Sequence, residues 1–584
     1  MSGSPRSEHF DDIYFAVENG LEETKHVFLG GNDLPERWQN RSRFTIAETG
    51  FGTGLNFISA WKCFEGTTAP HQKLHFISVE KYPLSPAQIK EYLFPWQGEI
   101  GSYVDRLTEL YPLRTTGWHT LHLTDRVSLL LIFDDVNRAF PELDARIDAW
   151  FLDGHAPAKN PEMWSETVFS AMKRLSAPGA TCATFTAAGV AKRGLKDAGF
   201  AIDKRRGFGR KRDMIVGRCA GQSLDISKTL IKTVAVIGGG LAGSTAAHAL
   251  LRRGLHVDLF EKEKLGAGAS GNPLGLFNPR FSAQRSAESD FFGSAYALAV
   301  STFKSLQNKV DIGYKPCGSL HLMTDSDKEK RYANLHENWN WHSDHLSFLD
   351  AAEATECSGV SLNHACLFLP DSGVVSPEKL CQSLSAGATF IREEVAALKY
   401  VDGLWSLNGK KYDAVILANA ASCLKFSQVA NLPFHTVRGQ LSFVTGAVPL
   451  KTNLCYGGYC SVEVKGSHVL GSTFQPWLTD TTLRAEDHER ILGNFADAVP
   501  TLSGKFTVTG GRAALRTAAK DRIPVGGVVH GYPGLYISTA HGSHGLLSTL
   551  MIAEQLAAQC AGEDPVLPRS TLQLLSPSRF LQKL

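Results

Sequence analysis

The chain has 584 residues, of which 43% are hydrophobic and 20% are charged, which is the balance of a folded globular protein. At about 150 residues per domain, this length allows two large domains or three to four smaller ones. No run of 18 unbroken apolar residues is present, and the first residues lack the apolar core of a signal peptide, so neither a membrane span nor secretion is expected. The 11 cysteines contain no CxxC pair, which argues against a zinc ribbon or a disulfide framework and favours reduced thiols in the cytoplasm.

Charge is distributed unevenly, although the net charge is only +2. Residues 1–172 contain 15 Lys and Arg against 24 Asp and Glu, whereas residues 173–218 contain 12 against 3. Such a basic segment suits the phosphate backbone of a nucleic acid, but a solvated hairpin beside an acidic surface would have the same composition. Six cations fall within nine residues: Lys204, Arg205, Arg206, Arg210, Lys211 and Arg212.

The first part of the chain alternates strand and helix patterns. Helices are predicted at Pro161–Leu175 and Val190–Ala198. This alternation predicts an α/β domain with a doubly wound, mostly parallel sheet, in which ligands bind at the carboxyl ends of the strands. The predicted strands include Leu74–Glu80, Leu129–Phe133, Ile147–Asp153 and Thr181–Thr186, and the acids at strand ends are Glu48, Glu80, Asp135 and Asp153.

A glycine loop, with Gly50, Gly52 and Gly54, follows the first of these acids. Glycines let the backbone approach a ligand closely because no Cβ intervenes. The acid before the loop, Glu48, suits the cationic sulfonium of S-adenosylmethionine better than a pyrophosphate. We expect Glu80 to accept both ribose hydroxyls and Asp135 to accept an adenine amino proton. The alternative is a Rossmann-like domain whose acids only cap helices.

The segment after Asp153 is rich in proline and ends in Lys159-Asn160-Pro161. An acid at a strand tip before such a loop suits an enzyme that methylates an amine. An alkylammonium with a pKa of about 10.4 must lose its proton before it reacts, which costs roughly 4–5 kcal/mol at pH 7. A carboxylate can receive that proton, and loop carbonyls can orient the amine. The alternative role of Asp153 is to cap the following helix.

Residues 219–231 have turn residues without a clear period and are predicted to be a linker. A second strand, glycine loop and helix follow, with Gly238, Gly240 and Gly243 in the dinucleotide-binding spacing and Glu261 placed 23 residues after Gly238. This pattern predicts FAD or NAD, or else a degenerate Rossmann unit. FAD is favoured because residues 266–272 are glycine-rich and residues 534–546 read as a late strand, loop and helix that return to the cofactor.

Two further features lie near the end of the chain. Arg516 is a candidate carboxylate clamp because guanidinium offers a rigid two-pronged donor, although a surface ion pair would explain it as well. His541 and His544 have a spacing that metal ligands also use, but no acid or cysteine lies nearby in the sequence, so we expect no metal.

Together these residues resemble one family, the bifunctional bacterial enzymes that complete 5-methylaminomethyl-2-thiouridine in tRNA. The resemblance covers nearly the whole chain. The second half is similar to flavoproteins of the D-amino-acid and glycine oxidase class. The matching segments include residues 10–15, 20–24, 27–32, 50–56, 150–154, 156–161 and 207–212 in the first half, and Gly238, residues 268–272, residues 438–440, Arg516, Asp521 and Pro524 in the second.

The resemblance implies two domains. Residues 1–218 would form a Rossmann-like class I methyltransferase domain that uses S-adenosylmethionine. Residues 232–584 would form a two-part FAD-binding oxidoreductase domain, with a Rossmann unit and a mixed-sheet substrate subdomain. The family places the amine-facing acid at Asp153 and a carboxylate-binding arginine at Arg516. The segments expected to line the flavin include Ser270, Gly271, Asn272, Gly545 and Leu546.

The resemblance also implies a reaction order. The FAD domain would oxidise the carboxymethylaminomethyl group of uridine 34 in tRNA and release glyoxylate, and the first domain would then methylate the resulting amine. We expect a cytoplasmic monomer whose cations at 204–212 bind tRNA.

The chain departs from the family at two positions. Ala420 stands where the family usually has glycine beside the flavin, and His544 stands where many relatives have arginine. Two other functions therefore stay open. One is a small-molecule amine oxidase fused to an amine methyltransferase, and the other is a tRNA-binding methyltransferase whose flavin domain is inactive.

Overall fold

The structure is a computed structural model of the chain, and it divides into two compact units. The first comprises residues 1–228 with Asp564–Arg569, and the second comprises Thr229–Glu563 with Ser570–Leu584. No helix among the described residues is long and apolar enough to cross a membrane. The described residues are 6–7, 9, 12–15, 19–154, 157–209, 211–221, 231–339 and 341–583, without the side chains of 7, 336, 337, 582 and 583.

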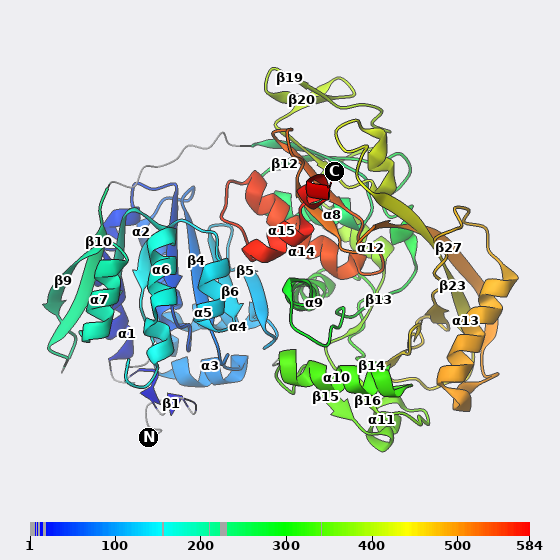
Figure 1. The fold of residues 1–584 in the computed structure, drawn as a ribbon, viewed down its shortest axis with the longest axis horizontal. Helices are drawn as coiled ribbons and strands as arrows, with labels where there is room; N and C mark the ends of the chain where they lie inside the picture. The colour runs from blue at the N-terminus through cyan, green and yellow to red at the C-terminus, as the bar shows by residue number, and fades with distance from the viewer. Residues whose placement is uncertain are drawn as a thin grey trace. The chain divides into compact units, whose positions relative to one another are not determined.

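The first unit is built on an eight-stranded sheet (Figure 1). Its five middle strands, which are β6, β4, β3, β7 and β8 in spatial order, pair in parallel. Antiparallel strands complete both edges. The order across the sheet is β5 (Gly117–His122), β6 (Val127–Phe133), β4 (Lys73–Glu80), β3 (Arg43–Glu48), β7 (Ile147–Phe151), β8 (Ser176–Thr184), β10 (Asp213–Cys219) and β9 (Phe200–Arg206).

Helices cover both faces of this sheet because its strands are apolar on both sides. Ile46 packs into a core with α2 (Leu55–Thr67) and α4 (Gln97–Leu110), whereas its neighbour Ala47 packs into a second core on the other face. Successive strand residues point to opposite faces, so this division shows the predicted doubly wound arrangement. The second core includes residues of α5 (Val136–Glu142), α6 (Glu166–Leu175) and α7 (Gly189–Asp197).

Several boundaries differ from prediction, among them those of the strand predicted at Thr181–Thr186, which runs from Ser176 to Thr184 as β8. The strand that precedes Asp153 ends at Phe151, and the helix predicted at Pro161–Leu175 is a 3₁₀ turn (Pro161–Trp164) followed by α6. Ser165 separates the two because its hydroxyl accepts from the Val168 amide and caps α6. β10 runs to Cys219, and most of the predicted linker, residues 222–230, lies outside the described residues. The small elements of this unit are β1 (Arg6–Ser7), β2 (Asp12–Ile13), α1 (Gly20–Thr24) and α3 (Pro86–Leu93).

The second unit contains a six-stranded, mostly parallel sheet with α8 (Leu241–Leu251) following its first strand. One face packs against the small antiparallel sheet of β19 (Lys399–Val401), β20 (Leu404–Leu407) and β21 (Lys410–Tyr412). Buried Arg253 pairs with Glu554 and so links the end of α8 to α14 (Gly545–Cys560). The strand order is β18 (Thr389–Ile391), β12 (His256–Phe260), β11 (Thr233–Ile237), β22 (Ala414–Leu417), β29 (Leu535–Thr539) and β28 (Val525–Val528).

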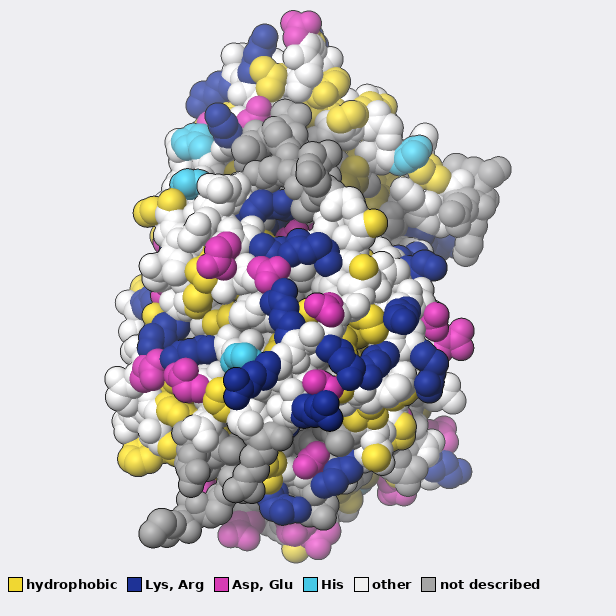
Figure 2. All heavy atoms as spheres, turned by 90° about the vertical axis from the view of Figure 1, so that its left-hand side faces the viewer, with side chains coloured by type: hydrophobic (Ala, Val, Ile, Leu, Met, Phe, Trp, Pro, Cys, Tyr) yellow, Lys and Arg dark blue, Asp and Glu magenta, His cyan; other side chains and the backbone are white. Residues whose placement is uncertain are grey.

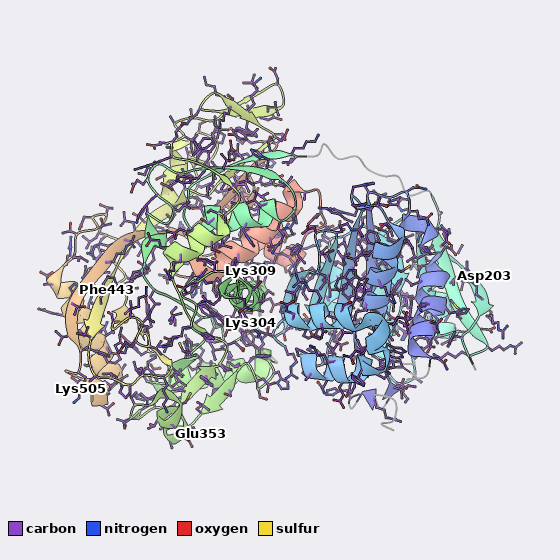
Figure 3. The ribbon with its side chains drawn as sticks, turned by 180° about the vertical axis from the view of Figure 1, so that it is seen from behind. Asp203, Lys304, Lys309, Glu353, Phe443 and Lys505 are labelled. Carbon is purple, nitrogen blue, oxygen red and sulfur yellow. The ribbon has the colours of Figure 1, made fainter. Side chains whose placement is uncertain are left out.

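A mixed eight-stranded sheet completes this unit, as predicted for a substrate subdomain. Its longest pairing joins β23, marked by Phe443 in Figure 3, to β27. The order is β15 (Ser347–Leu349), β16 (Cys366–Leu369), β14 (Ser319–Leu322), β24 (Asn453–Cys455), β25 (Tyr459–Cys460), β26 (His468–Gly471), β23 (Phe434–Thr445) and β27 (Thr507–Ala519). The remaining elements are β13 (Gly275–Phe277), β17 (Gly373–Val375), α9 (Ala287–Gln307), α10 (Ser326–Trp339), α11 (Ala351–Ser358), α12 (Pro377–Leu384), α13 (Ala485–Ala498) and α15 (Arg569–Leu575).

Candidate functional site

The glycine loop of the first unit joins β3 to α2 and is held against the end of β4. Gly54 precedes α2 with a φ of 79°, a left-handed conformation that favours glycine. The Gly52 amide donates to Oε2 of Glu80 at 2.8 Å, and the Tyr82 amide donates to Oε1 at 2.8 Å. The loop and Glu80 therefore meet at the carboxyl edge of the sheet, where a nucleoside ligand is expected.

Asn56 joins two of the predicted acids. Its Nδ2 donates to Oε1 of Glu48 at 2.9 Å and to Oδ2 of Asp153 at 2.6 Å, and its Oδ1 accepts from Thr24 Oγ1 at 2.8 Å. Ser78 Oγ donates to the other oxygen of Glu48 at 2.7 Å. Asn56 was not among the site residues predicted from sequence. The signals that could have found it are its place in the matching segment 50–56 and its position two residues after Gly54.

The two acids have different protonation tendencies. Burial raises the pKa of Glu48 well above its usual value, and the nearby Asp153 charge raises it further. Burial also raises the pKa of Asp153, to about 6, against the opposing effects of the Asn56 hydrogen bond and the Lys211 charge. Burial thus favours the protonated form of Glu48, whereas Asp153, with a pKa of about 6, is mostly ionised at pH 7 and close to its titration point. This pair separates a structural carboxyl group from a proton acceptor.

The surroundings of Asp153 include a cation from the basic hairpin. Lys211 Nζ lies 2.7 Å from Oε1 of Glu23 and 4.1 Å from the centre of the Phe185 ring. The Lys211 charge lowers the pKa of Asp153, and the Glu23 charge raises it. Asp153 does not cap a helix, because the N-caps that follow are Asn160 and Ser165.

Asp135 caps α5 through its Oδ1, which accepts from the Asn137 amide at 2.9 Å. Its Oδ2 lies 2.8 Å from Lys81 Nζ. Both oxygens thus have protein partners, and contact with adenine stays a proposal. A buried hydroxyl without a partner in the described part of the chain, that of Tyr111, lies near Glu80 and leaves a polar group for a ligand.

The glycine loop of the second unit requires glycine for close packing. A Cβ at Gly243 would collide with the carbonyl oxygen of Gly238, and one at Gly238 would lie 2.6 Å from that of Ala418. Glu261 accepts from the Gly239 amide at 2.8 Å, so the acid at the end of β12 holds this loop. The arrangement places the loop, the acid and the start of α8 together, as a dinucleotide site requires.

The segment predicted to line the flavin lies beside this loop. Ser270 Oγ accepts from the Leu241 amide at 2.9 Å at the start of α8, close to Gly240, where a Cβ would lie 3.1 Å from that hydroxyl. Asn272 Oδ1 accepts from Arg512 Nη1 at 2.8 Å, and a Cβ at Gly271 would lie 2.7 Å from Nη2. Arg512, on β27, therefore holds this segment, a role that was not predicted from sequence.

The two departures from the family lie in unusual environments. Ala420 follows β22 with a φ of 54°, in the left-handed region that favours glycine, the residue that the resemblance predicts at this position. The preceding Asn419 has a buried Oδ1 without a partner in the described part of the chain, next to the Gly238 loop. The unpaired Oδ1 of Asn419 and the closely packed Gly238 loop both fit a bound cofactor.

The rings of the two late histidines, His541 and His544, contact other side chains of the protein. His541 Nδ1 lies 2.9 Å from Ser548 Oγ, and burial lowers its pKa to about 4. His544 precedes Gly545 and Leu546 at the start of α14 and packs on the Phe292 ring, and burial lowers its pKa to about 4. No metal-binding group of His, Cys, Asp or Glu occurs among the described residues. His544 is thus neutral at pH 7 and supplies no positive charge for a carboxylate.

Arg516, on β27, lies across the neighbouring strand β23. Its Nη2 donates to Ser472 Oγ at 2.5 Å and its Nη1 donates to Ser543 Oγ at 3.2 Å. A Cβ at Gly439 would collide with Nη2, so the absence of a side chain at Gly439 makes room for the guanidinium. Its polar contacts are hydroxyls, with no ion pair in the described part of the chain. The charge is therefore available to an anion, in contrast to the predicted alternative of a surface ion pair.

The basic segment forms a hairpin of β9, marked by Asp203 in Figure 3, and β10. Lys and Arg side chains gather across the middle of the face shown in Figure 2. Arg206 and Arg212 are exposed and form no ion pair in the described part of the chain, whereas Arg210 lies outside the described residues. The paired cations are Lys204 with Asp213, Arg205 with Asp33 and Lys211 with Glu23.

Comparisons with known proteins match two family models to different parts of the chain. Residues 233–559 match the FAD dependent oxidoreductase family, and residues 98–220 match an S-adenosyl-L-methionine-dependent methyltransferase family. The tRNA 5-methylaminomethyl-2-thiouridine biosynthesis bifunctional protein MnmC of Methylobacillus flagellatus is 37% identical over 99% of this chain and 95% of its own. That of Chromohalobacter salexigens is 36% identical over 100% of this chain and 91% of its own. The chain belongs to the MnmC family.

This membership confirms the predicted fold class, both enzyme classes and both cofactors, S-adenosylmethionine and FAD. Among solved structures, glycine oxidase from Geobacillus kaustophilus has a TM-score of 0.52 at 22% identity, covering 58% of this chain and 97% of its own. L-proline dehydrogenase from P. horikoshii has a TM-score of 0.52 at 19% identity, covering 61% and 99%. These two likenesses show a shared fold.

We predict that Asp153→Asn lowers the rate of methyl transfer by about 10²- to 10⁴-fold without loss of S-adenosylmethionine binding, because the amide cannot accept the proton. In the wild type, kcat/KM should fall as the pH drops below about 6, where the raised pKa of Asp153 protonates the carboxylate. Rates measured against pH with an aminomethyl-uridine substrate test this. Lys211→Met should move the midpoint to higher pH and Glu23→Gln to lower pH, and shifts in one common direction would contradict the assignment.

We predict that Ala420→Gly raises the stability of the second unit by up to about 1 kcal/mol. A residue with a Cβ costs about 1–2 kcal/mol in the left-handed region, and the larger conformational entropy that glycine loses on folding offsets part of the gain from removing the Cβ. Release of flavin fluorescence on heating measures the effect. Ala421→Gly is the matched control: its φ is not positive, so it should lower stability by about 0.5–1 kcal/mol. Equal losses in both variants would show that position 420 is unstrained.

Proposed function

We propose that the protein performs two consecutive reactions on the wobble uridine of tRNA. The FAD domain removes the carboxymethyl group of 5-carboxymethylaminomethyl-2-thiouridine, and the other domain methylates the 5-aminomethyl group that remains. One observation carries this proposal most directly: Lys211 belongs to the basic hairpin and its charge acts on Asp153. A surface suited to a polyanion therefore borders the proton-accepting group. The function named for the full-length relatives supports the same proposal.

In the oxidation, Arg516 binds the carboxylate of the substituent, because among the described residues its fork of donors has neutral hydroxyls as partners. When bound, FAD supplies a hydride acceptor and S-adenosylmethionine supplies a methyl donor. The CH₂ beside the carboxylate loses a hydride, the C=N bond adds water, and the carbon fragment leaves as glyoxylate. The product is a primary amine, which the methyltransferase domain needs.

In the methylation, Asp153 takes the proton that the alkylammonium must lose. Asn56 holds the carboxylate through Oδ2 and also donates to Glu48, whose pKa is raised by burial and by the Asp153 charge. The predicted roles of Gly50 and Gly52 are to let the cofactor approach, and that of Glu80 is to accept the ribose hydroxyls.

The two alternatives make different predictions about the same residues. A small-molecule amine enzyme has no use for exposed Arg206 and Arg212, which form no ion pair in the described part of the chain. An inactive flavin domain would be consistent with Ala420 and with neutral His544, but Arg516 and the Gly238 loop keep an arrangement that fits substrate and cofactor. We further propose that the protein is a cytoplasmic monomer.

Nucleoside mass spectrometry tests the proposed order. Bulk tRNA from cells that lack the gene is incubated with the pure protein, with or without S-adenosylmethionine. We expect the carboxymethylaminomethyl nucleoside to fall, the aminomethyl nucleoside to rise, and the methylated nucleoside to form only with the cofactor. Methylation without any loss of the carboxymethylaminomethyl nucleoside would show an inactive oxidase domain. No change in any nucleoside would refute the tRNA function.

We predict that Arg206→Glu and Arg212→Glu weaken tRNA binding at low salt. The plot of the logarithm of the binding constant against the logarithm of the salt concentration should become less steep by about 1 for each phosphate contact that is lost. Binding titrations over a range of salt concentrations measure this. Lys90→Glu, an exposed lysine on α3, is the control and should leave the slope unchanged. Equal slopes in all variants would place the RNA surface elsewhere.

A further inference from the structure

The segment between β26 and α13 exposes large apolar side chains. Phe474 is 53% exposed, Trp477 is 70% exposed and Leu483 is 47% exposed. Exposed apolar side chains that gather on one segment, aromatic rings among them, are typical of a surface that binds a partner. Ser472, two residues before Phe474, is the residue that contacts Arg516. The exposed rings thus begin beside the proposed carboxylate site of the oxidase domain.

A buried arginine holds this segment in place. Arg438 on β23 is fully buried and pairs with Asp487 of α13. Its Nε donates to the carbonyl oxygen of Asp480 at 3.1 Å, and its Nη2 donates to that of Thr482. Five donors of one guanidinium can fix a loop that has few apolar contacts of its own. The aromatic residues are therefore presented on an anchored segment.

The strand register shows which way Phe474 points. Arg438 and Gln475 exchange both backbone hydrogen bonds, at 3.1 and 3.0 Å, and the Thr473 amide donates to the Gln440 carbonyl oxygen at 3.1 Å. Phe474 therefore lies opposite Gly439, and opposite residues of an antiparallel pair have side chains on the same face. That face of Gly439 is the one over which the Arg516 guanidinium lies. Phe474 and the guanidinium are thus neighbours on one surface.

We propose that Phe474 and Trp477 form a stacking platform for bases of the tRNA anticodon loop, with the modified uracil on Phe474 and an adjacent base on Trp477. This rests on the proposed function. The substituent places four bonds between its carboxyl carbon and C5 of the uracil, a span of about 5 Å. Phe474 lies opposite Gly439, at the cross-strand spacing of about 4.5–5.5 Å. A substituent whose carboxylate is held by Arg516 over Gly439 is therefore long enough to bring the uracil ring toward Phe474. Unpaired bases are commonly bound by stacking on aromatic side chains.

The test measures binding of a fluorescent anticodon stem-loop that carries the carboxymethylaminomethyl uridine to the full-length protein. Phe474→Ala and Trp477→Ala should each weaken binding by about 5-fold to about 100-fold, as the loss of one stacked base predicts. Trp477→Phe and Phe474→Tyr should restore most of the affinity, because any aromatic face can stack. Leu483→Ala, which removes an exposed aliphatic group from the same segment, should bind like the wild type.

Flavin reduction by the same stem-loop separates the two proposals. If the wild-type flavin is not reduced, the proposed oxidation is wrong and the platform falls with it. If the wild-type flavin is reduced but the alanine variants bind the stem-loop as tightly as the wild type, the platform alone is wrong. If Leu483→Ala weakens binding as much as Trp477→Ala, the segment is a general apolar surface for a protein partner rather than a base-stacking site.

Discussion

Both units are organised by the same kind of hydrogen bond. In each, a glutamate at the end of one strand accepts from a backbone amide of the glycine loop that follows the neighbouring parallel strand. Glu80 accepts from Gly52 and Glu261 from Gly239, both at 2.8 Å. Because the glutamate is held by its own strand, the bond aligns the loop and the start of the next helix with the edge of the sheet. Asn56 on α2 and Ser270 beside α8 take their positions from this alignment.

The parts of the fold that were predictable from sequence are those set by local rules. Apolar runs that end in an acid predicted β4 and the end of β3, because strands buried on both faces need continuous apolar residues. The spacing of Gly238, Gly240 and Gly243 predicted the second loop, because each position excludes a Cβ for a separate reason. The hairpin of cations was predictable as a surface, since six charges in nine residues cannot be buried together.

The contacts that sequence reasoning missed join residues far apart in the chain. The link from Thr24 through Asn56 to Asp153 depends on where α1 and α2 pack, and no spacing in the sequence indicates it. The same holds for Lys211, which was predicted only as an RNA contact but whose charge also acts on Asp153. From the sequence, Arg438 was identified only as part of the segment 438–440 that matches the family. Its burial beside the loop carbonyl groups depends on the three-dimensional fold.

The separation of charge along the first unit has a consequence for how fast it meets its substrate. Residues 1–218 contain 27 Lys and Arg against 27 Asp and Glu, so this stretch has no net charge, yet residues 173–218, which include the hairpin at one edge of the sheet, contain 12 against 3. It is therefore an electric dipole. A polyanion approaching within about one Debye length, roughly 8 Å at physiological salt, experiences a torque that turns the hairpin toward it before any contact forms. Orientation before collision raises the fraction of productive encounters, without the non-specific adhesion that a large net positive charge would cause.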